Sequence, residues 1–569
     1  MNVRRRGALL GKENGSQDLE TTKADLFDAI SHPVRIKILE ALNEKPMGFA
    51  ELGRAVGIES GGHLSFHLTK LRHLIRTNSR GDYALTADGK EALRAVHVPV
   101  PVKSLEGKLE PATLDILRIA VLPFTSISPD PKDAYFADGL TEELITRISL
   151  VKGLEVIART SVMGFKRKDK KVSEIGRELR VGTLLEGSVR KDGNKIRVSA
   201  QLINADTEGH LWGQNYDRSV EDIFAVQSEI AEKMAEALKV KILPRDSERL
   251  SRARTTNMEA YASYLKGMRA TASAAREDIE RAEVNFERAI TLDRDFAEAY
   301  TGLAGVYAIR GIVGDYTPAE AYEKAYSVAV KALALDDTLA EAHEAIGAAY
   351  SLGLRMKEAM REHKRALELN PNYVTARYMY AYALMYDGRM DEAILEFKKA
   401  EELDPIGTAR NGGLCIAYLA MGDEENAFKV AKRFVEIEPD DMNASNVLGY
   451  LYLKRGEREE ALRYFNLLSE KGGKGWSGYL GYGLAKVGER EEAKKILDRL
   501  IEKSKSSYVA PTIVAMIYAG MGDREKAFEW LDKAAQVKDP QLVFLPLDHP
   551  WFELRSDPRF SKILKTAGL

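Results

Sequence analysis

The 569-residue sequence has one cysteine, almost no net charge and no long apolar run, and each shortage excludes a class of protein. A single cysteine, Cys415, cannot form a disulfide framework and fits a reducing compartment. A net charge of −2 gives the chain no general attraction for nucleic acid, so any basic surface must be local. No run approaches the roughly 20 apolar residues that cross a bilayer. The apolar stretch "GALLG" near the N-terminus is too short for a signal peptide. We therefore expect a cytoplasmic protein without a membrane anchor.

The motifs of common enzymes are also missing. The sequence contains no G-x-x-x-x-G-K-[ST], no G-x-G-x-x-G after a strand, no H-E-x-x-H and no C-x-x-C. The acidic residues Asp138, Glu142 and Glu143 cluster at the start of a predicted helix, where the helix dipole favours carboxylates. We therefore expect no enzyme activity, no cofactor and no metal.

A 34-residue repeat fills the second half of the chain. Alanines recur at steps of 34, 34, 34, 32 and 34, and from the second onwards each follows a glycine five residues earlier: Ala359, Ala393, Ala427, Ala461, Ala493 and Ala527. Small residues let two antiparallel helices cross closely, and the glycine ends the first helix of each pair. One pair cannot bury its apolar face alone, so neighbouring pairs stack into a superhelix.

This spacing resembles the tetratricopeptide repeat, with about eight units over residues 258–540. The resemblance implies a surface that binds a protein or peptide. The aromatic and amide residues at the family's groove positions have two interpretations. They could hold an extended peptide, or they could pack between helices. The predicted groove residues are Thr375, Tyr378, Tyr382, Met385, Tyr386, Asn443, Asn446 and Tyr450.

The N-terminal part follows another pattern. Helical segments in "SHPVRIKIL", "FAELGRAVGI" and "HLSFHLTKL" precede a strand–turn–strand and the ending "YALTADGKEAL". This order resembles the winged helix-turn-helix of ArsR-like regulators, in the form common among archaeal proteins. ArsR-type metal sensors generally use cysteine pairs, which this chain lacks, so the spacing of His63 and His67 does not change the expectation of no metal.

The resemblance implies that the third helical stretch and the wing meet DNA. Between Ser60 and Gly81 there is no acidic side chain. We expect short polar residues to read base edges and cations to hold phosphates. The alternative is that residues 23–96, which we call the head, contact only protein. The predicted DNA-binding residues are His63, Ser65, His67, Thr69, Lys70, Arg72, Arg76 and Arg80. Such heads usually bind as symmetric dimers, so we expect a homodimer formed through helices 23–31 and 87–96.

The middle of the chain carries "IAVLPF", "YFADGLTEELI", "IGRELRVGTLLEGSVR" and "QLINADTEGHLW". These stretches resemble the TolB N-terminal-like, FlgO-related domain that accompanies repeat arrays in bacterial regulators. The pattern predicts an α/β layer of about four strands, with a hairpin turning at "KDGNK".

The sequence thus predicts a multidomain fold: an α+β winged helix, a small α/β domain and an all-α repeat superhelix in the second half. The predicted segments are a flexible arm (1–22), the winged helix (23–96), a linker (97–117), the α/β domain (118–241), a linker (242–257), the repeats (258–540) and a cap (541–569). In the cap, Trp551, Phe552, Leu554, Phe560 and Leu564 can cover the last repeat. The predicted function is a DNA-binding transcriptional regulator whose repeats bind a protein. The alternative is an interaction scaffold that does not bind DNA.

Overall fold

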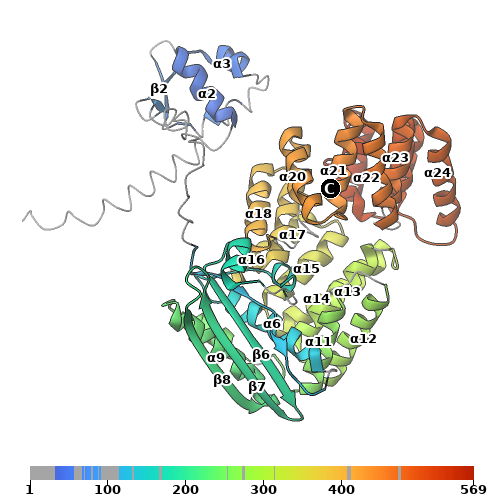
Figure 1. The fold of residues 1–569 in the computed structure, drawn as a ribbon. Helices are drawn as coiled ribbons and strands as arrows, with labels where there is room; N and C mark the ends of the chain where they lie inside the picture. Colours follow the sequence, from blue (N-terminus) through green and yellow to red (C-terminus); the bar gives the residue numbers. More distant parts are fainter. Residues whose placement is uncertain are drawn as a thin grey trace, which may run out of the picture. The chain divides into compact units, whose positions relative to one another are not determined.

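The computed structural model divides the chain into two compact units, residues 1–112 and 113–569 (Figure 1). The described residues are 33–56, 64, 67–68, 71–72, 74–78, 81–86, 89–90, 114–130, 133–165, 170–252, 254–271, 276–312, 314–405, 412–471 and 476–569. None of the helices within these residues is long and apolar enough to cross a bilayer.

The described part of the first unit is a small helical core beside a two-stranded sheet. Helices α2 (Pro33–Glu44) and α3 (Phe49–Val56) pack together, and β1 (Ile75–Thr77) pairs antiparallel with β2 (Tyr83–Leu85). The predicted strand–turn–strand is therefore confirmed. Leu39, Leu52, Leu64 and Leu71 belong to one buried cluster. The helix expected over 23–31 and most of that over 87–96 lie outside the described residues, and the winged-helix assignment stays a prediction.

The second unit opens with a six-stranded mixed sheet. The strand order is β5 (Glu155–Val156), β3 (Arg118–Val121), β6 (Thr183–Asp192), β7 (Lys195–Asn204) and β8 (His210–Ser219), with the short β4 (Thr125–Ser126) beside β6. Residues 193–194 form the predicted two-residue turn between β6 and β7. The prediction of about four strands was too low, because β8 has no clean alternation of apolar and polar residues.

Helices cover this sheet and continue toward the repeats. They are α6 (Ala134–Ser149), α7 (Arg159–Met163), α8 (Val172–Leu179), the short η2 (Val220–Asp222), α9 (Ile223–Ala237) and α10 (Pro244–Ser251). Val198, Ala200 and Leu202 are fully buried on the covered face, whereas Arg197 and Gln201 are exposed on the other. Alternation along β7 therefore decides which face of the sheet the helices cover.

The repeat array consists of eight helix pairs over the described residues (Figure 1). The first helices are α11 (Met258–Ala270), α13 (Ala297–Ile312), α15 (Ala340–Leu352), α17 (Val374–Tyr386), α19 (Gly412–Ala420), α21 (Met442–Lys454), α23 (Ser477–Val487) and α25 (Pro511–Met521). The second helices are α12 (Arg276–Leu292), α14 (Pro318–Leu335), α16 (Met356–Leu369), α18 (Met390–Leu403), α20 (Glu424–Ile437), α22 (Arg458–Lys471), α24 (Arg490–Ser504) and α26 (Arg524–Gln536).

The repeat alanines and glycines have the roles predicted from their spacing. Each of the six aligned alanines, from Ala359 to Ala527, is fully buried. The five glycines that precede the aligned alanines, such as Gly388 and Gly422, have φ between +76° and +98°. This left-handed conformation suits a residue without a Cβ atom.

The chain closes with η4 (Pro540–Phe544), η5 (His549–Trp551) and α27 (Pro558–Ala567). We call residues 540–569 the C-terminal segment. As expected, Trp551, Leu554 and Phe560 are buried against residues of α25 and α26. The same buried cluster also contains Leu354 and Tyr482, so the segment reaches well beyond the last repeat.

Candidate functional site

The structure describes three of the eight predicted DNA-binding residues. Arg72 and Arg76 are exposed, in agreement with a surface role. His67 was expected to contact DNA, but it is only 1% exposed. The physical reason is its spacing: residue 67 lies three positions after Leu64 and four before Leu71, on the buried face. The other five, His63, Ser65, Thr69, Lys70 and Arg80, lie outside the described residues.

The predicted groove residues lie on the first helices of two repeats, α17 and α21. On α17, Tyr378 and Met385 are buried, and the ring of Tyr382 packs edge-on against Phe397 with centroids 5.1 Å apart. Thr375 and Asn443 are half-buried. These contacts favour the alternative in which the α17 tyrosines pack between helices.

The remaining groove residues contact the C-terminal segment. The ring of Tyr386 lies edge-on to Phe544 at 5.7 Å. Tyr450 stacks on the imidazole of His549, with centroids 4.4 Å apart and an interplanar angle of 13°. A surface predicted to receive a partner is thus covered by the chain itself.

Hydrogen bonds fix the C-terminal segment against α21 and α23. Nε2 of His549 lies 2.9 Å from Oδ1 of Asn446, and Asn446 Nδ2 donates to Oδ1 of Asp548 at 3.3 Å. The hydroxyl of Tyr479 donates to the other oxygen of Asp548. Burial raises the pKa of Asp548 to about 6 and lowers that of His549 to about 3. His549 is therefore neutral at pH 7, so its Nε2 donates to the amide oxygen only as the N–H tautomer.

A second candidate site is the junction between the α/β domain and the repeats. A polar residue follows the second helix of four successive repeats: Asp293, Asp336, Asn370 and Asp404. The α/β domain and its linker meet each one in turn. Thr255 donates to Asp293, and Arg252 lies 2.6 Å from Asp336.

The other two positions meet the region around α6 and α7. Asn370 donates to the hydroxyl of Ser149 at 2.9 Å. Thr160 and Ser161 each donate to Asp404 at 2.6 Å. The last three polar positions are 34 residues apart, so the repeat period carried a signal for this junction that our sequence interpretation missed.

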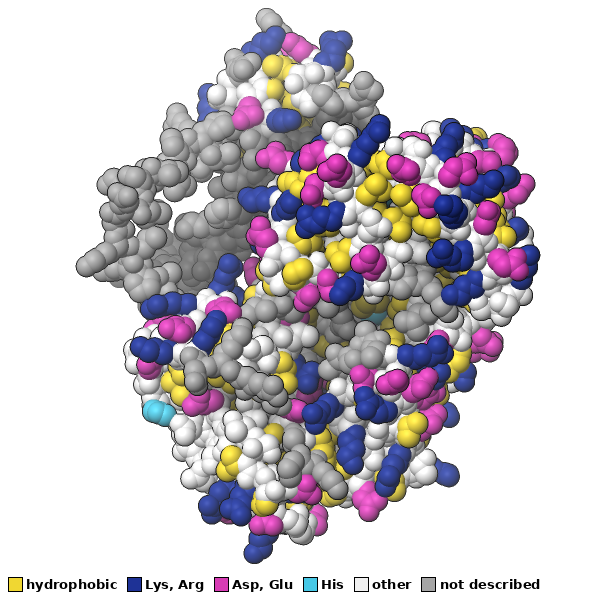
Figure 2. Space-filling view, turned by 45° about the vertical axis from the view of Figure 1, so that its right-hand side comes forward, with side chains coloured by type: hydrophobic (Ala, Val, Ile, Leu, Met, Phe, Trp, Pro, Cys, Tyr) yellow, Lys and Arg dark blue, Asp and Glu magenta, His cyan; other side chains and the backbone are white. Residues whose placement is uncertain are grey.

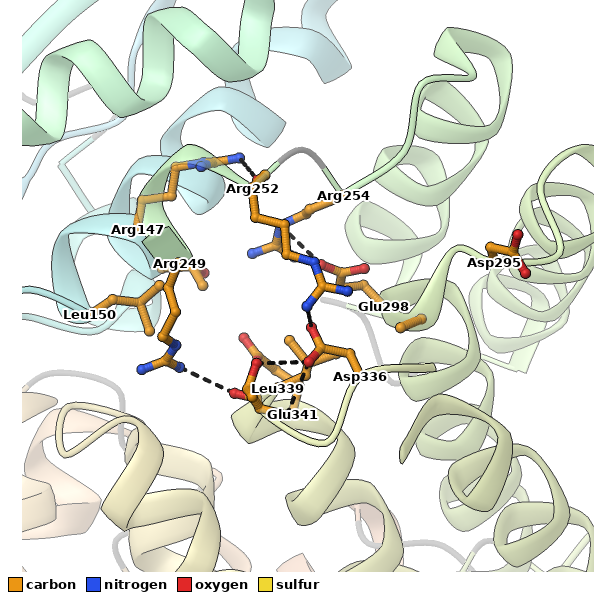
Figure 3. A pocket seen from close by; sticks show the side chains of 13 residues that line it. Arg147, Leu150, Arg249, Arg252, Arg254, Asp295, Glu298, Asp336, Leu339 and Glu341 are labelled. Carbon is orange, nitrogen blue, oxygen red and sulfur yellow. Dashed lines mark hydrogen bonds and ion pairs between the residues drawn. The ribbon is translucent and has the colours of Figure 1, made fainter. Parts of the chain in front are cut away.

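Four arginines surround a pocket of about 220 Å³ at this junction (Figure 3). Arg147 is 3% exposed and donates to Gln227 and Ser228. Arg249 donates to the carbonyls of Leu369 and Thr338. The lining residues are Thr146, Arg147, Leu150, Arg249, Arg252, Arg254, Asp295, Ala297, Glu298, Asp336, Thr338, Leu339 and Glu341.

The most buried ion pairs of the junction are centred on Arg254. Its Nε lies 2.9 Å from Glu143 and 3.5 Å from Glu298, and all three side chains are about 11% exposed or less. Burial raises the pKa of Glu298 to about 7, although the charge of Arg254 opposes this shift. Every arginine of the pocket already contacts polar or acidic groups of the protein. This arrangement is typical of a structural interface and not of a ligand-binding site. Among the described residues, no cluster of three or more His, Cys, Asp or Glu side chains could hold a metal.

Comparison with known families gives three matches along the chain. Residues 23–96 match a domain of unknown function (DUF7347), residues 115–233 match the second domain of HilA/YgeH-like transcriptional regulators, and residues 332–405 match the tetratricopeptide repeat. The chain therefore joins tetratricopeptide repeats to a domain similar to one found in transcriptional regulators. The resemblances to ArsR-like and TolB-like domains stay predictions.

Individual proteins match only parts of the chain. The protein named "Putative adenylate cyclase 3" of Rhizobium meliloti (strain 1021) is 37% identical over 243 residues, and the match spans 42% of this chain and 41% of that protein. The structure of Pseudomonas aeruginosa pilF is 24% identical, with a TM-score of 0.30, over 38% of this chain and 94% of that one. A monomeric IFIT1 mutant with Gppp-AAAA is 15% identical, with a TM-score of 0.40, over 61% and 80%.

Proposed function

We propose that this protein is a transcriptional regulator whose head binds DNA and whose repeat array binds a protein partner. The observation that carries the proposal is the match of residues 115–233 to the second domain of HilA/YgeH-like transcriptional regulators. In this chain that domain follows a separate compact head and is built into a repeat array.

The head presents exposed cations at its hairpin. Arg76 is exposed on β1, at the hairpin that a winged helix would use as its wing, and Arg72 is exposed just before it. Cations at such positions attract phosphates independently of the base sequence. We propose that His63, Ser65 and Thr69 contact base edges, and we leave out His67 because it is buried.

The repeat array offers surface outside the groove positions that the C-terminal segment covers. Leu395 on α18 and Val284 on α12 are 52% and 64% exposed on second helices. Figure 2 shows one face of the molecule, where hydrophobic side chains lie in patches between basic and acidic ones. A protein partner would bind this outer surface, because contact with Asn446 or Tyr450 requires displacement of the C-terminal segment.

We also propose that the chain is not an enzyme. The relative named as an adenylate cyclase shares less than half of its length with this chain, so its name does not carry an activity over. The sequence lacks the nucleotide-binding and metal-binding motifs named above. Incubation with ATP and Mg²⁺ should yield no cyclic nucleotide above a no-protein control.

The decisive experiment measures DNA binding by the full chain. Genomic fragments, including the region upstream of its own gene, are titrated at two salt concentrations. We expect binding at low salt that weakens steeply as salt rises. Arg76→Ala should weaken binding to all fragments and lower the salt slope by about 0.9 for the lost phosphate contact.

Lys37→Ala is the matched control, because it removes one exposed positive charge from α2 that is not among the predicted DNA-binding residues. It should leave the affinity and the salt slope unchanged. Absence of binding at low salt, or equal effects of the two variants, would favour the scaffold that does not bind DNA.

A further inference from the structure

The strand β8 forms an open edge of the sheet. It is ten residues long, as are β6 and β7, and β7 is its partner along the whole length (Figure 1). Within the described residues no strand pairs with its outer side. A long free edge is a template for pairing with another strand, and natural proteins usually block it.

The register of the sheet shows which backbone groups of β8 are available. Asp192 and Lys195 flank a two-residue turn and therefore form a hydrogen-bonded pair. Counting in steps of two along β7, Val198, Ala200 and Leu202 bond toward β8. Their partners on β8 are even-numbered, namely Tyr216, Gln214 and Trp212. The N–H and C=O groups of Gly213, Asn215 and Asp217 consequently point away from the sheet, whereas Leu211 lies at the bulge and is not assigned by this count.

This edge lacks the usual protection against pairing. Residues 210–216, "HLWGQNY", contain no proline and no acidic or basic side chain apart from His210. Leu211 is 42% exposed. The one bulge in the pairing with β7 lies at the end of the strand, beside Leu202 and Ile203. Charges that would normally repel another strand are therefore absent from most of its length.

The charges at the end of β8 are already neutralised within the chain. Asp217 forms a bidentate pair with Arg197, at 2.6 and 3.0 Å, and Arg218 lies 3.9 Å from Glu229. When β8 is placed antiparallel to a copy of itself over residues 210–218, Asp217 faces Leu211 of the copy. Arg218 faces His210 of the copy, and no two carboxylates meet directly across the pair.

We propose that β8 pairs antiparallel with β8 of a second copy, so that the two sheets join across a twofold axis at Gln214. Self-pairing uses both free edges and forms a closed dimer. A strand pair alone covers less than the roughly 1,200–2,000 Å² of a stable interface, so the dimer should be reversible. This inference is independent of the head and of DNA binding.

A cysteine at the axis tests the register. Gln214 is exposed and would lie in a non-hydrogen-bonded pair with its copy, at a Cα separation of about 4.5 Å, which a disulfide can span. In a Cys415→Ala background, which removes the one native thiol, Gln214→Cys should give a disulfide-linked dimer under mild oxidation. Gln201→Cys, exposed on the face of β7 one strand inward, is the matched control and should stay largely monomeric.

A proline at the edge tests the hydrogen bonds. The N–H of Asn215 points outward, so Asn215→Pro removes a donor from the new pairing and leaves the β7 ladder intact. Light scattering of the full chain over a concentration series should show a dimer that Asn215→Pro weakens at least tenfold and Asn215→Ala does not. A monomer at all concentrations, a dimer that resists Asn215→Pro, or equal cross-linking at 214 and 201 would overturn the proposal.

Discussion

A single buried histidine shows how the repeats tolerate a polar residue in their core. His363 on α16 is fully buried, and neither ring nitrogen has a hydrogen-bond partner. It packs against Gly347 of its own repeat as Phe465 packs against Gly449, and Phe397 occupies the same position of the 34-residue repeat. Burial lowers the pKa of His363 to about 3, so it is neutral at pH 7. This position of the repeat therefore holds a buried aromatic ring, and in the repeat of His363 an imidazole takes the place of a phenylalanine ring.

His363→Phe should therefore stabilise the protein. Removing two unpaired ring nitrogens from the interior should raise the free energy of unfolding by about 1–2 kcal/mol. Denaturant unfolding of the full chain at pH 7 measures this change. The reverse substitution, Phe397→His, should lower it by at least as much. A destabilised His363→Phe protein would show that an unseen water or side chain satisfies the imidazole.

Asp548 should make the stability of the C-terminal segment depend on pH. Its pKa of about 6 in the folded protein exceeds its ordinary value of 3.8, because burial disfavours the carboxylate. The folded state therefore binds more protons between these values. The contribution of Asp548 to stability is complete below about pH 4 and is lost as the pH rises through 6.

The variant Asp548→Asn isolates this effect, since His549 titrates in both proteins. The free energy of unfolding of the parent, minus that of the variant, should fall between pH 4 and 6. The fall should be about 3 kcal/mol at most, at about 1.4 kcal/mol per pKa unit. A difference that stays flat over this range would mean that Asp548 titrates near its ordinary value.

At the scale of single elements, the turns within the repeats depend on backbone conformation. Gly422 follows α19 with φ of +80°, and no atom lies within 4 Å of where a Cβ would stand. Gly422→Ala should therefore cost about 1–2 kcal/mol through backbone strain alone. Gly305 is the control, because it is exposed within α13 and also has open space around it. Gly305→Ala should stabilise by about 0.5–1 kcal/mol. Thermal unfolding of both variants measures these changes. A loss of stability at residue 422 but not at residue 305 indicates backbone strain, because neither added Cβ atom meets a neighbouring atom.

The elements that the sequence predicted well are those with a local signal. The repeat helices follow from the period of small residues, because close crossing of helices leaves no room for larger side chains. The hairpin of β6 and β7 follows from the turn at Gly193 and Asn194. The strand β8 was missed since exposure of nearly all its residues removes the alternation on which such a prediction depends.

The candidate sites were harder to predict because they join distant parts of the chain. Asn446 and His549 meet across 103 residues, and Thr160 and Asp404 across 244. No spacing rule connects such pairs. His67, by contrast, could have been placed correctly, since its position relative to Leu64 and Leu71 already assigned it to the buried face.

On the scale of the whole second unit, the α/β domain and the repeats are one body. A continuous buried cluster runs from Ile119 in β3 to Leu352 in α15. The ion pairs of Arg254 with Glu143 and Glu298 lie inside this junction. Both parts should consequently unfold in a single transition.

Removing Arg254 should destabilise this body strongly. Arg254→Met leaves two buried carboxylates without their cation, which typically costs about 3–5 kcal/mol. Arg252→Ala is the matched control, since Arg252 is 57% exposed and its pair with Asp336 should contribute less than about 1 kcal/mol. Calorimetry of the two variants measures both changes. Separate melting of the α/β domain in the parent protein would contradict the single-body description.

The contacts of the C-terminal segment also set the order in which the molecule can be completed during translation. Domains form as the chain emerges, N-terminal parts first. The helices α17 and α21 are synthesised well before Phe544 and His549, the side chains that cover Tyr386 and Tyr450. Until those residues emerge, a nascent chain carries an uncovered aromatic surface. A chain that ends before residue 540 thus has its repeat helices but leaves this aromatic surface exposed. We expect chaperones and proteases to bind such a chain.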